Sequence, residues 1–200
     1  MRDKLVFKAK RRTVVTATAV VAVLLGGALA ATLLTQGKGN ASDLNAADGI
    51  VEYQAAQRPL APNVTGTSLT GSTLKLSSYR GKTVVLNFWG SWCPPCRAEA
   101  PTLQVLNEQY SSKGVAFLGD DVNDTPTNAL AFIRGDGITY PSFSDNGYLI
   151  VADFSDAGVA ISDTPTTVVI DKTGHVVGLV LGSVSYGQLT TLIKDAAVNQ

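Results

Sequence analysis

The stretch Asn87-Phe88-Trp89-Gly90-Ser91-Trp92-Cys93-Pro94-Pro95-Cys96-Arg97-Ala98-Glu99 holds both cysteines of this 200-residue chain. An apolar run at 83–86 leads into it, and apolar residues at helical spacing follow it as far as Tyr110, so the cysteines are predicted where a strand turns into a helix. Unpaired backbone N–H groups and the positive end of the helix dipole at a helix start favour a thiolate, the form of cysteine that attacks disulfides. The spacing of Cys93 and Cys96 at such a junction therefore predicts a redox-active pair.

The surrounding pattern predicts alternating strands and helices. Residues 84–89 are apolar except for Asn87, which is typical of a strand in the middle of a sheet that is covered on both faces. In chain order, we expect a β-hairpin at 63–69 and 72–76, the strand at 84–89, a helix at 95–110, a strand at 115–118, a helix at 126–134 capped by Thr125, a strand, turn and brief helix within 136–163, a hairpin at 166–171 and 175–181, and a last helix capped by Ser185. This order predicts an α/β fold with a central sheet flanked by helices.

The N-terminal segment differs in composition from the rest. Six of the sixteen Lys and Arg residues lie in the basic segment 1–12, and 21 uncharged residues rich in Val, Ala and Leu follow at 14–34, enough to span a bilayer as a helix. We therefore expect a transmembrane anchor or signal segment at 13–34. By the positive-inside rule, segment 1–12 is cytoplasmic and the C-terminal domain of this single-pass membrane protein is extracytoplasmic.

Two alternatives to a retained anchor remain open. Ala28-Leu29-Ala30 resembles a signal-peptide cleavage site, which would leave a secreted protein, and Arg11-Arg12 resembles a twin-arginine export signal. In each of these cases the C-terminal domain again lies outside the cytoplasm.

The rest of the chain divides into a linker and one folded domain. Residues 35–58 are small, polar and weakly patterned, which predicts a flexible linker, and residues 59–200 form the predicted domain. From Lys38 onward ten bases face fifteen acids, a net charge of about −5. This balance argues against a nucleic-acid partner, which requires clustered Lys and Arg on the folded part.

Two blocks of sequence, 87–101 and Thr164-Pro165-Thr166-Thr167 with the following 168–174, resemble the TlpA/ResA-like branch of the thioredoxin superfamily. The similarity extends over about 59–200. It implies a thioredoxin fold, that is a central mixed sheet flanked by helices, with an N-terminal β-hairpin, a central insertion and a cis-proline at Pro165 that faces the cysteines. It also implies a membrane-tethered thiol–disulfide oxidoreductase that uses the Cys93–Cys96 disulfide and no separate cofactor.

Three side chains are the candidates for chemistry. Cys93 is the expected nucleophile, because it comes first and should be the more exposed of the pair, and Cys96 should resolve the mixed disulfide. Glu99 lies three residues past Cys96, where the family resemblance implies an acid that tunes the thiols; a solvated helical carboxylate is the alternative. Asn87 stands where cytosolic thioredoxins carry a buried aspartate, which moves any acid–base role towards Glu99.

Other residues are expected to bind the substrate. A cis X-Pro bond presents the backbone of the preceding residue for strand-like pairing. Of the two tryptophans, Trp92 is expected to be exposed beside Cys93 and Trp89 to be in the core. The predicted substrate-binding residues are Trp92, Pro94, Pro95, Thr164 and Pro165.

The expected activity is the reduction of cysteine pairs in exported proteins such as apocytochrome c, by a chain that a membrane electron-donor protein recharges. A disulfide-forming oxidase for exported proteins is the main alternative, since fold and motif are common to both directions of electron flow. A structural zinc site is not expected, because two cysteines and the single His175 do not supply four ligands.

Overall fold

The computed structural model describes residues 49–198, and the structural statements below refer to these residues. In chain order the elements are β1 (Ile50–Glu52), η1 (Ala55–Gln57), β2 (Thr65–Thr67), β3 (Thr73–Lys75), η2 (Leu76–Tyr79), β4 (Thr83–Trp89), α2 (Pro94–Tyr110), η3 (Ser111–Lys113), β5 (Val115–Val122), α3 (Pro126–Gly135), β6 (Ser142–Asp145), α4 (Leu149–Asp156), β7 (Thr166–Ile170), β8 (Val176–Leu181) and α5 (Tyr186–Val198). The membrane segment predicted at 13–34 lies outside this range, and within 49–198 no helix is long and apolar enough to cross a membrane.

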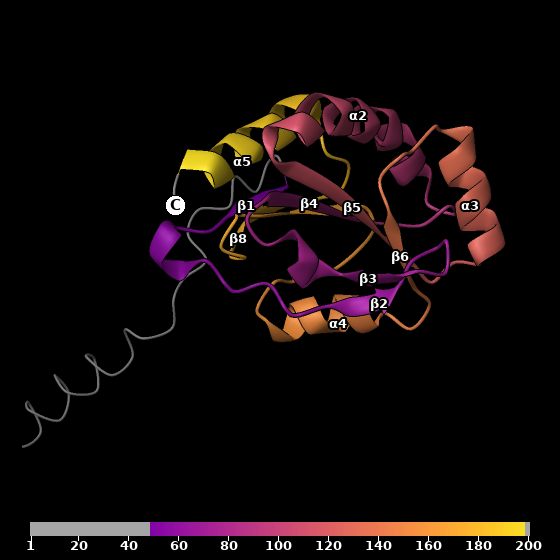
Figure 1. Cartoon of the computed structure of the whole chain (residues 1–200), viewed down its shortest axis with the longest axis horizontal. Coiled ribbons are helices and arrows are strands. Elements are labelled where there is room, and N and C mark those ends of the chain that lie inside the picture. The colour runs from indigo at the N-terminus through magenta and orange to yellow at the C-terminus, as the bar shows by residue number, and fades with distance from the viewer. Residues whose placement is uncertain (1–48, 199–200) are drawn as a thin grey trace, which may run out of the picture. The chain divides into compact units, whose positions relative to one another are not determined.

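The main sheet has six strands in the order β1-β8-β7-β4-β5-β6. Strand β4 lies inside it, parallel to β5 on one side and antiparallel to β7 on the other. Helices α2 and α5 cover one face, and α4 lies on the other face together with the β2–β3 hairpin (Figure 1). This is a thioredoxin-like mixed α/β fold, and the predicted N-terminal hairpin is confirmed.

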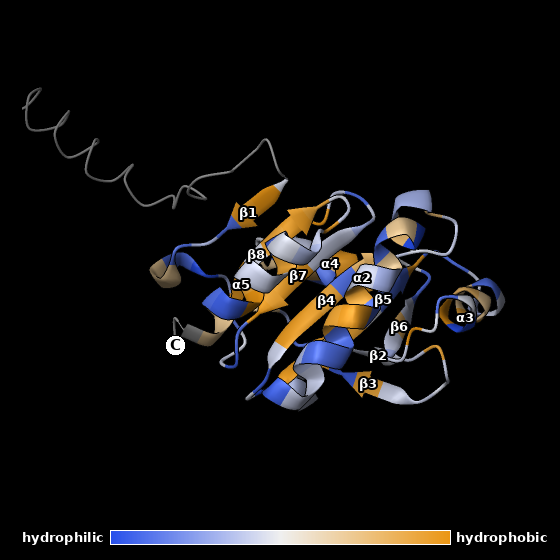
Figure 2. Ribbon diagram, turned by 90° about the horizontal axis from the view of Figure 1, so that it is seen from above, coloured by the Kyte–Doolittle hydropathy of each residue, from blue (hydrophilic) through white to orange (hydrophobic). Residues whose placement is uncertain are grey.

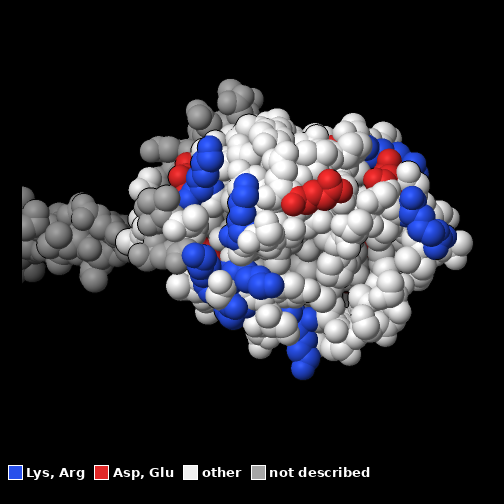
Figure 3. All heavy atoms as spheres, turned by 45° about the horizontal axis from the view of Figure 1, so that its top comes forward, with Lys and Arg blue, Asp and Glu red and all other residues white. Residues whose placement is uncertain are grey.

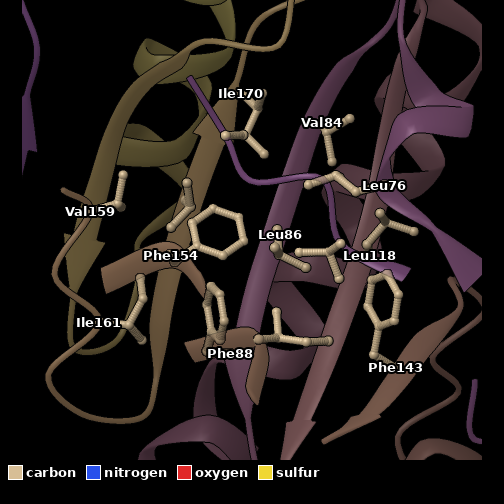
Figure 4. Packing of buried hydrophobic residues seen from close by; sticks show 14 of the residues in the cluster. Leu76, Val84, Leu86, Phe88, Leu118, Phe143, Phe154, Val159, Ile161 and Ile170 are labelled. Atoms are coloured by element: carbon tan, nitrogen blue, oxygen red, sulfur yellow. The ribbon is translucent and has the colours of Figure 1, made fainter. Parts of the chain in front are cut away.

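All seven residues of β4 are buried, which confirms the prediction of a strand covered on both faces. The strands form an apolar layer, whereas the helices carry hydrophilic residues on their outer sides (Figure 2). On the face that α4 covers, Leu86 and Phe88 pack with Leu118 and Phe154, and the rings of Phe88 and Phe154 meet edge to face at 5.5 Å (Figure 4). Burial of side chains from both faces of β4 fixes the strand that leads to the cysteines.

The helix starts follow the predicted capping pattern. The Thr125 hydroxyl accepts a hydrogen bond from the Asn128 backbone N–H at 3.3 Å. Ser185 and Gln188 form a reciprocal pair, because the Ser185 hydroxyl accepts from the Gln188 N–H at 3.3 Å and the Ser185 N–H donates to the Gln188 side chain at 2.8 Å. Both caps satisfy backbone donors that a helix start leaves unpaired.

Strand β5 is longer than predicted. It continues past Leu118 to Val122 and so includes Asp120 and Asp121, which are fully buried. The two acids interrupt the apolar pattern, and the sequence therefore predicted an end at 118. Parallel pairing with β4 and with β6 carries the strand through them, since Asp120 lies opposite Phe88 on β4 and opposite Phe143 on β6.

The folded part also begins earlier than predicted. Strand β1 lies in the range 35–58 expected to be a flexible linker, yet it pairs antiparallel with β8 and forms one edge of the main sheet. Three residues are too few to give a periodic pattern. The strand exists because the exposed edge of β8 accepts its backbone, with Ile50 opposite Val180 and Glu52 opposite Gly178.

Much of the acidity of this domain is internal. Six carboxyl side chains are buried, namely those of Glu99, Asp120, Asp121, Asp124, Asp145 and Asp171. On the face drawn in Figure 3, most Lys and Arg side chains gather towards the left, a few more lie at the right edge, and acidic side chains are sparse. The net negative charge deduced from the composition therefore does not describe the whole surface, because several of the acidic side chains are inside the domain.

Gly178 tests whether β1 contributes to stability. A Cβ at this position would lie 2.6 Å from the Val51 carbonyl oxygen and 3.0 Å from a methyl carbon of Leu192. We expect Gly178→Ala to lower the free energy of unfolding by about 1–3 kcal/mol in urea titrations, because the β1 backbone has to move. Gly187→Ala is the control, since a Cβ there meets no atom within 4 Å, and on helix α5 it should leave the free energy of unfolding unchanged or raise it by up to about 1 kcal/mol. Equal stability of the two variants would contradict the pairing of β1.

Candidate redox site

The two cysteines lie at the start of α2, directly after β4, and form a disulfide with a Cα–Cα distance of 5.3 Å. Cys93 is the N-cap residue of the helix, and its Sγ accepts a hydrogen bond from the Cys96 backbone N–H at 3.2 Å. Pro94 and Pro95 fill the first two helical positions and have no N–H. The first free donor of the helix is therefore directed at the Cys93 sulfur.

Burial does not distinguish the two cysteines. Both are 2% exposed, so the prediction that Cys93 is the more exposed residue is wrong for the disulfide form. They pack in one apolar cluster with Trp89, Ala100 and Phe132, which covers both residues. Cys93 differs from Cys96 in that its sulfur also contacts the loop before β7.

That loop contains the predicted cis-proline. The Thr164–Pro165 peptide bond is cis, and the Thr164 carbonyl oxygen lies 3.7 Å from the Cys93 Sγ. Because Cys93 is oxidised and carries no thiol hydrogen, this is a contact and not a hydrogen bond. The Thr166 hydroxyl donates to the Asp163 carbonyl at 2.7 Å and holds the loop from the other end. The two sequence blocks, 71 residues apart at this contact, thus meet at one sulfur atom.

Glu99 lies inside the protein, next to the cysteine pair on the same helix. It is 3% exposed, so the alternative of a solvated helical carboxylate is wrong. One carboxylate oxygen accepts a hydrogen bond from the Asn87 side-chain amide at 2.8 Å, and the other accepts from the Val184 backbone N–H at 2.7 Å. Asn87 also donates to the Thr167 hydroxyl at 3.0 Å. The carboxylate therefore connects α2 to β4, β7 and the loop before α5.

The surroundings of Glu99 favour proton exchange near neutral pH. Burial raises its pKa to about 7, and the hydrogen bonds from Val184 and Asn87 counteract part of that rise. The buried Tyr140 ring lies near enough that its own pKa is raised first by burial and then by the charge of Glu99. A carboxyl group with such a pKa can hold or release a proton at the pH where thiols exchange.

The sequence did not lead us to a second group of acids, on and after β5. Asp124 binds the redox loop, because its carboxylate accepts from the Ser91 N–H at 2.8 Å and from the Thr125 N–H at 2.6 Å. Burial and the charge of Asp124 raise the pKa of Asp121 to about 7, and burial raises the pKa of Asp120 well above its ordinary value, with smaller effects of Asp145 and Asp121. The sequence does contain a signal for these acids, because an apolar strand is followed by the acidic run Asp120-Asp121-Val122-Asn123-Asp124.

The remaining predicted residues surround the disulfide. Trp92 is 52% exposed and Trp89 is 3% exposed, so both predictions for the tryptophans are confirmed. Pro94 and Pro95 are exposed at the helix start. Among the described residues, no three His, Cys, Asp or Glu side chains are arranged to hold a metal ion. A disulfide at a helix start, with a cis-proline loop against its first cysteine, defines the class of thioredoxin-fold thiol–disulfide oxidoreductases.

Comparison with known proteins agrees with this class. Residues 55–192 match the Redoxin family, and the chain belongs to that family. It is 34% identical over 134 residues to the thiol-disulfide oxidoreductase ResA of Bacillus thuringiensis, covering 67% of this chain and 75% of that protein. The ResA of Geobacillus kaustophilus is 34% identical over 125 residues, with 62% of this chain and 69% of that protein covered. This chain is a thiol–disulfide oxidoreductase.

Solved structures show the same architecture. A secreted thiol-disulfide isomerase from Corynebacterium glutamicum superposes with a TM-score of 0.70 at 30% identity, over 80% of this chain and 98% of that one. A DsbF homologue from Corynebacterium diphtheriae gives a TM-score of 0.69 at 31% identity, over 79% of this chain and 99% of that one. The fold described here is thus shared nearly over the full length of both structures.

The hydrogen bond between Asn87 and Glu99 can be tested by titration. Removing the amide donor in Asn87→Ala removes an interaction that favours the charged carboxylate, so we expect the pKa of Glu99 to rise above its wild-type value of about 7. Carbon-13 NMR titration of the side-chain carboxyl measures it. Asn107→Ala serves as the control, because Asn107 binds Thr139 at the surface and should leave the titration unchanged. A lowered or unaltered pKa in Asn87→Ala would contradict the described network.

Proposed function

We propose that this oxidoreductase is tethered to the membrane, works outside the cytoplasm and reduces cysteine pairs in exported proteins such as apocytochrome c. The observation that carries the proposal is the position of the Cys93 Sγ between the Cys96 N–H and the Thr164 carbonyl on the cis-proline loop. The uncharged segment at 14–34 supports the location, and the family relationship to ResA proteins supports the substrate class. A membrane electron-donor protein would return the disulfide to the dithiol.

In this mechanism the reduced pair gives two electrons to the substrate. The Cys93 thiolate attacks a substrate disulfide; a bond forms between Cys93 and one substrate sulfur, and the other substrate sulfur leaves as a thiolate. The Cys96 thiolate then attacks the Cys93 sulfur and releases the second substrate thiolate. The Cys93–Cys96 disulfide has formed, the substrate disulfide has been reduced, and the two substrate thiolates take up two protons.

Glu99 is the proposed proton acceptor for Cys96, one helical turn earlier. With a pKa of about 7 it can take the Cys96 thiol proton before the second attack and pass it on to solvent or to the leaving thiolate. The Asn87→Ala variant examines this role as well, because the pH at which disulfide exchange accelerates should shift upward together with the pKa of Glu99.

Two features favour the reducing direction. Pro94 and Pro95 supply no N–H, so one helix-start donor stabilises a Cys93 thiolate where an ordinary helix start would offer more. The buried carboxylate of Glu99 disfavours further negative charge nearby. Strong oxidants of this class owe their potential to a stabilised reduced form, and both features act against such stabilisation.

A disulfide-forming or isomerising activity is the second candidate. It is favoured by the similarity to the secreted thiol-disulfide isomerase of C. glutamicum and to the C. diphtheriae DsbF homologue. The fold and the cysteine pair serve both directions of electron flow, so the reduction potential separates the two.

We expect a reduction potential near about −270 mV for the Cys93–Cys96 couple, as in reducing members of the fold, because the thiolate has few donors. Equilibration with a glutathione or dithiothreitol redox buffer of known ratio, followed by alkylation and mass spectrometry, measures it. A potential near about −120 mV would support the oxidase and exclude the reductase.

A resolving-cysteine variant identifies the substrates. Cys96→Ala cannot release the mixed disulfide, so protein substrates should remain bound to Cys93 and be recovered by affinity purification under non-reducing conditions. The double variant Cys93→Ala/Cys96→Ala is the control and should retain none of them. Recovery of no disulfide-linked protein from cells that express Cys96→Ala would overturn the proposed exchange with protein substrates.

A further inference from the structure

A groove of about 220 Å³ lies directly beside the cysteine pair. Trp92 of the redox loop and Val122 at the end of β5 form one side, and Tyr148 and Val151 at the start of α4 form another. Ile161 and Thr164, on the segment that returns from α4 to the cis-proline, complete it. We call this the α4 groove, and most of its lining is apolar.

The walls of the α4 groove are held in place without a ligand. The Trp92 indole N–H donates to the Val122 carbonyl at 3.3 Å, and the indole lies so close to Gly90 that a Cβ there would be 2.6 Å from its nitrogen. Tyr148 has a left-handed backbone with φ of 56°, which is uncommon for an aromatic residue. The two following N–H groups donate to the Asp145 carboxylate at 2.8 and 2.9 Å and fix this conformation.

One residue of the groove wall contacts the reactive sulfur atom. Thr164 lines the groove and places its carbonyl oxygen 3.7 Å from the Cys93 Sγ. A mixed disulfide attaches the substrate cysteine to Cys93, and the chain on one side of that cysteine must then cross Thr164.

The spacing of an extended chain selects the residue that enters. Alternate residues of a strand point to the same side, about 7 Å apart, so a cysteine bound to Cys93 directs the residue two positions away towards the same surface. We propose that the α4 groove binds a large apolar side chain two residues from the substrate cysteine, and that Tyr148 determines this specificity. The proposal rests on the proposed exchange with protein substrates and adds to it the kind of sequence that is preferred.

One charged residue at the rim of the α4 groove further restricts which substrate side chains it can bind. Asp163 is exposed beside the groove, and its carboxylate accepts the Thr164 N–H at 2.8 Å. A substrate backbone that pairs with the Thr164 N–H has to displace the Asp163 carboxylate. An acidic substrate side chain in the groove would be repelled by that carboxylate. The substrate segment is therefore apolar and not acidic at the selected position.

Peptide kinetics test the preference. The reduced full-length chain in detergent is mixed with the peptide Phe-Ala-Cys-Ala-Phe or with Ser-Ala-Cys-Ala-Ser, each carrying glutathione as a mixed disulfide on its cysteine. The second-order rate constant for the release of glutathione is measured. We expect the Phe peptide to react about tenfold faster than the Ser peptide. In Tyr148→Asn, which keeps a residue type that accepts the left-handed backbone, this ratio should fall towards one. In Tyr186→Ala the ratio should be kept, because Tyr186 is 48% exposed, close to the 46% of Tyr148, but lies on α5 outside the groove.

A small disulfide separates this proposal from the activity itself. Reduction of hydroxyethyl disulfide should proceed at the same rate in the wild type and in both tyrosine variants, which shows that they are folded and that the cysteines react. Equal rates for the two peptides in the wild type, or an unchanged ratio in Tyr148→Asn, would overturn the groove as a specificity site and leave the exchange activity standing. If the wild type released glutathione from neither peptide while still reducing hydroxyethyl disulfide, the proposed exchange with polypeptide substrates would fail, and the groove proposal with it.

Discussion

The position of the reactive sulfur depends on the antiparallel pairing of β4 with β7. In this register Asn87 lies opposite Thr167 and Phe88 lies opposite Thr166, so the residue before the cis-proline arrives next to the cysteine that follows β4. A slip of one residue would turn every side chain of β7 to the other face of the sheet and separate Asn87 from Thr167. The apolar side chains on both faces of β4 exclude that slip, because they would otherwise be placed against the wrong layer.

The same pairing helps to stabilise a buried carboxylate, because it places Thr167 where it binds the Asn87 amide that also donates to Glu99. Glu99 accepts one hydrogen bond from β4, through Asn87, and one from the loop before α5, through Val184. Without these donors, burial at 3% exposure would raise the pKa of this carboxyl group further and favour its neutral form. With them its pKa stays at about 7, where both protonation states are populated at physiological pH. The network therefore gives the cysteine pair a neighbour that can exchange protons, in a protein whose single histidine lies on the hairpin between β7 and β8.

The insertion between α3 and β7, which consists of β6 and α4, adds the proposed specificity groove to a common framework. Strand β6 extends the sheet by one parallel strand, and Asp145 at its end caps the first turn of α4. The cap places Tyr148 opposite Trp92, so the exposed surface beside the disulfide becomes a groove. Phe154 and Ile161 pack in the hydrophobic cluster on this face of the sheet and so connect the insertion to the core (Figure 4).

The sequence by itself determined the order of the main elements, the placement of Cys93 and Cys96 at a strand–helix junction and the exposed Trp92. These features follow from local periodicity, from caps such as Thr125 and Ser185, and from motifs whose residues are close together in the chain. The cis bond before Pro165 was implied by the family resemblance of the block at 164–174. Tertiary structure alone decided that β1 joins the sheet, that β5 continues through Asp120 and Asp121, that both cysteines are equally buried and that Glu99 lies inside. Each of these depends on what a distant segment places beside the residue, a partner strand, a covering loop or a hydrogen-bond donor, and such proximity leaves no periodic trace in the sequence.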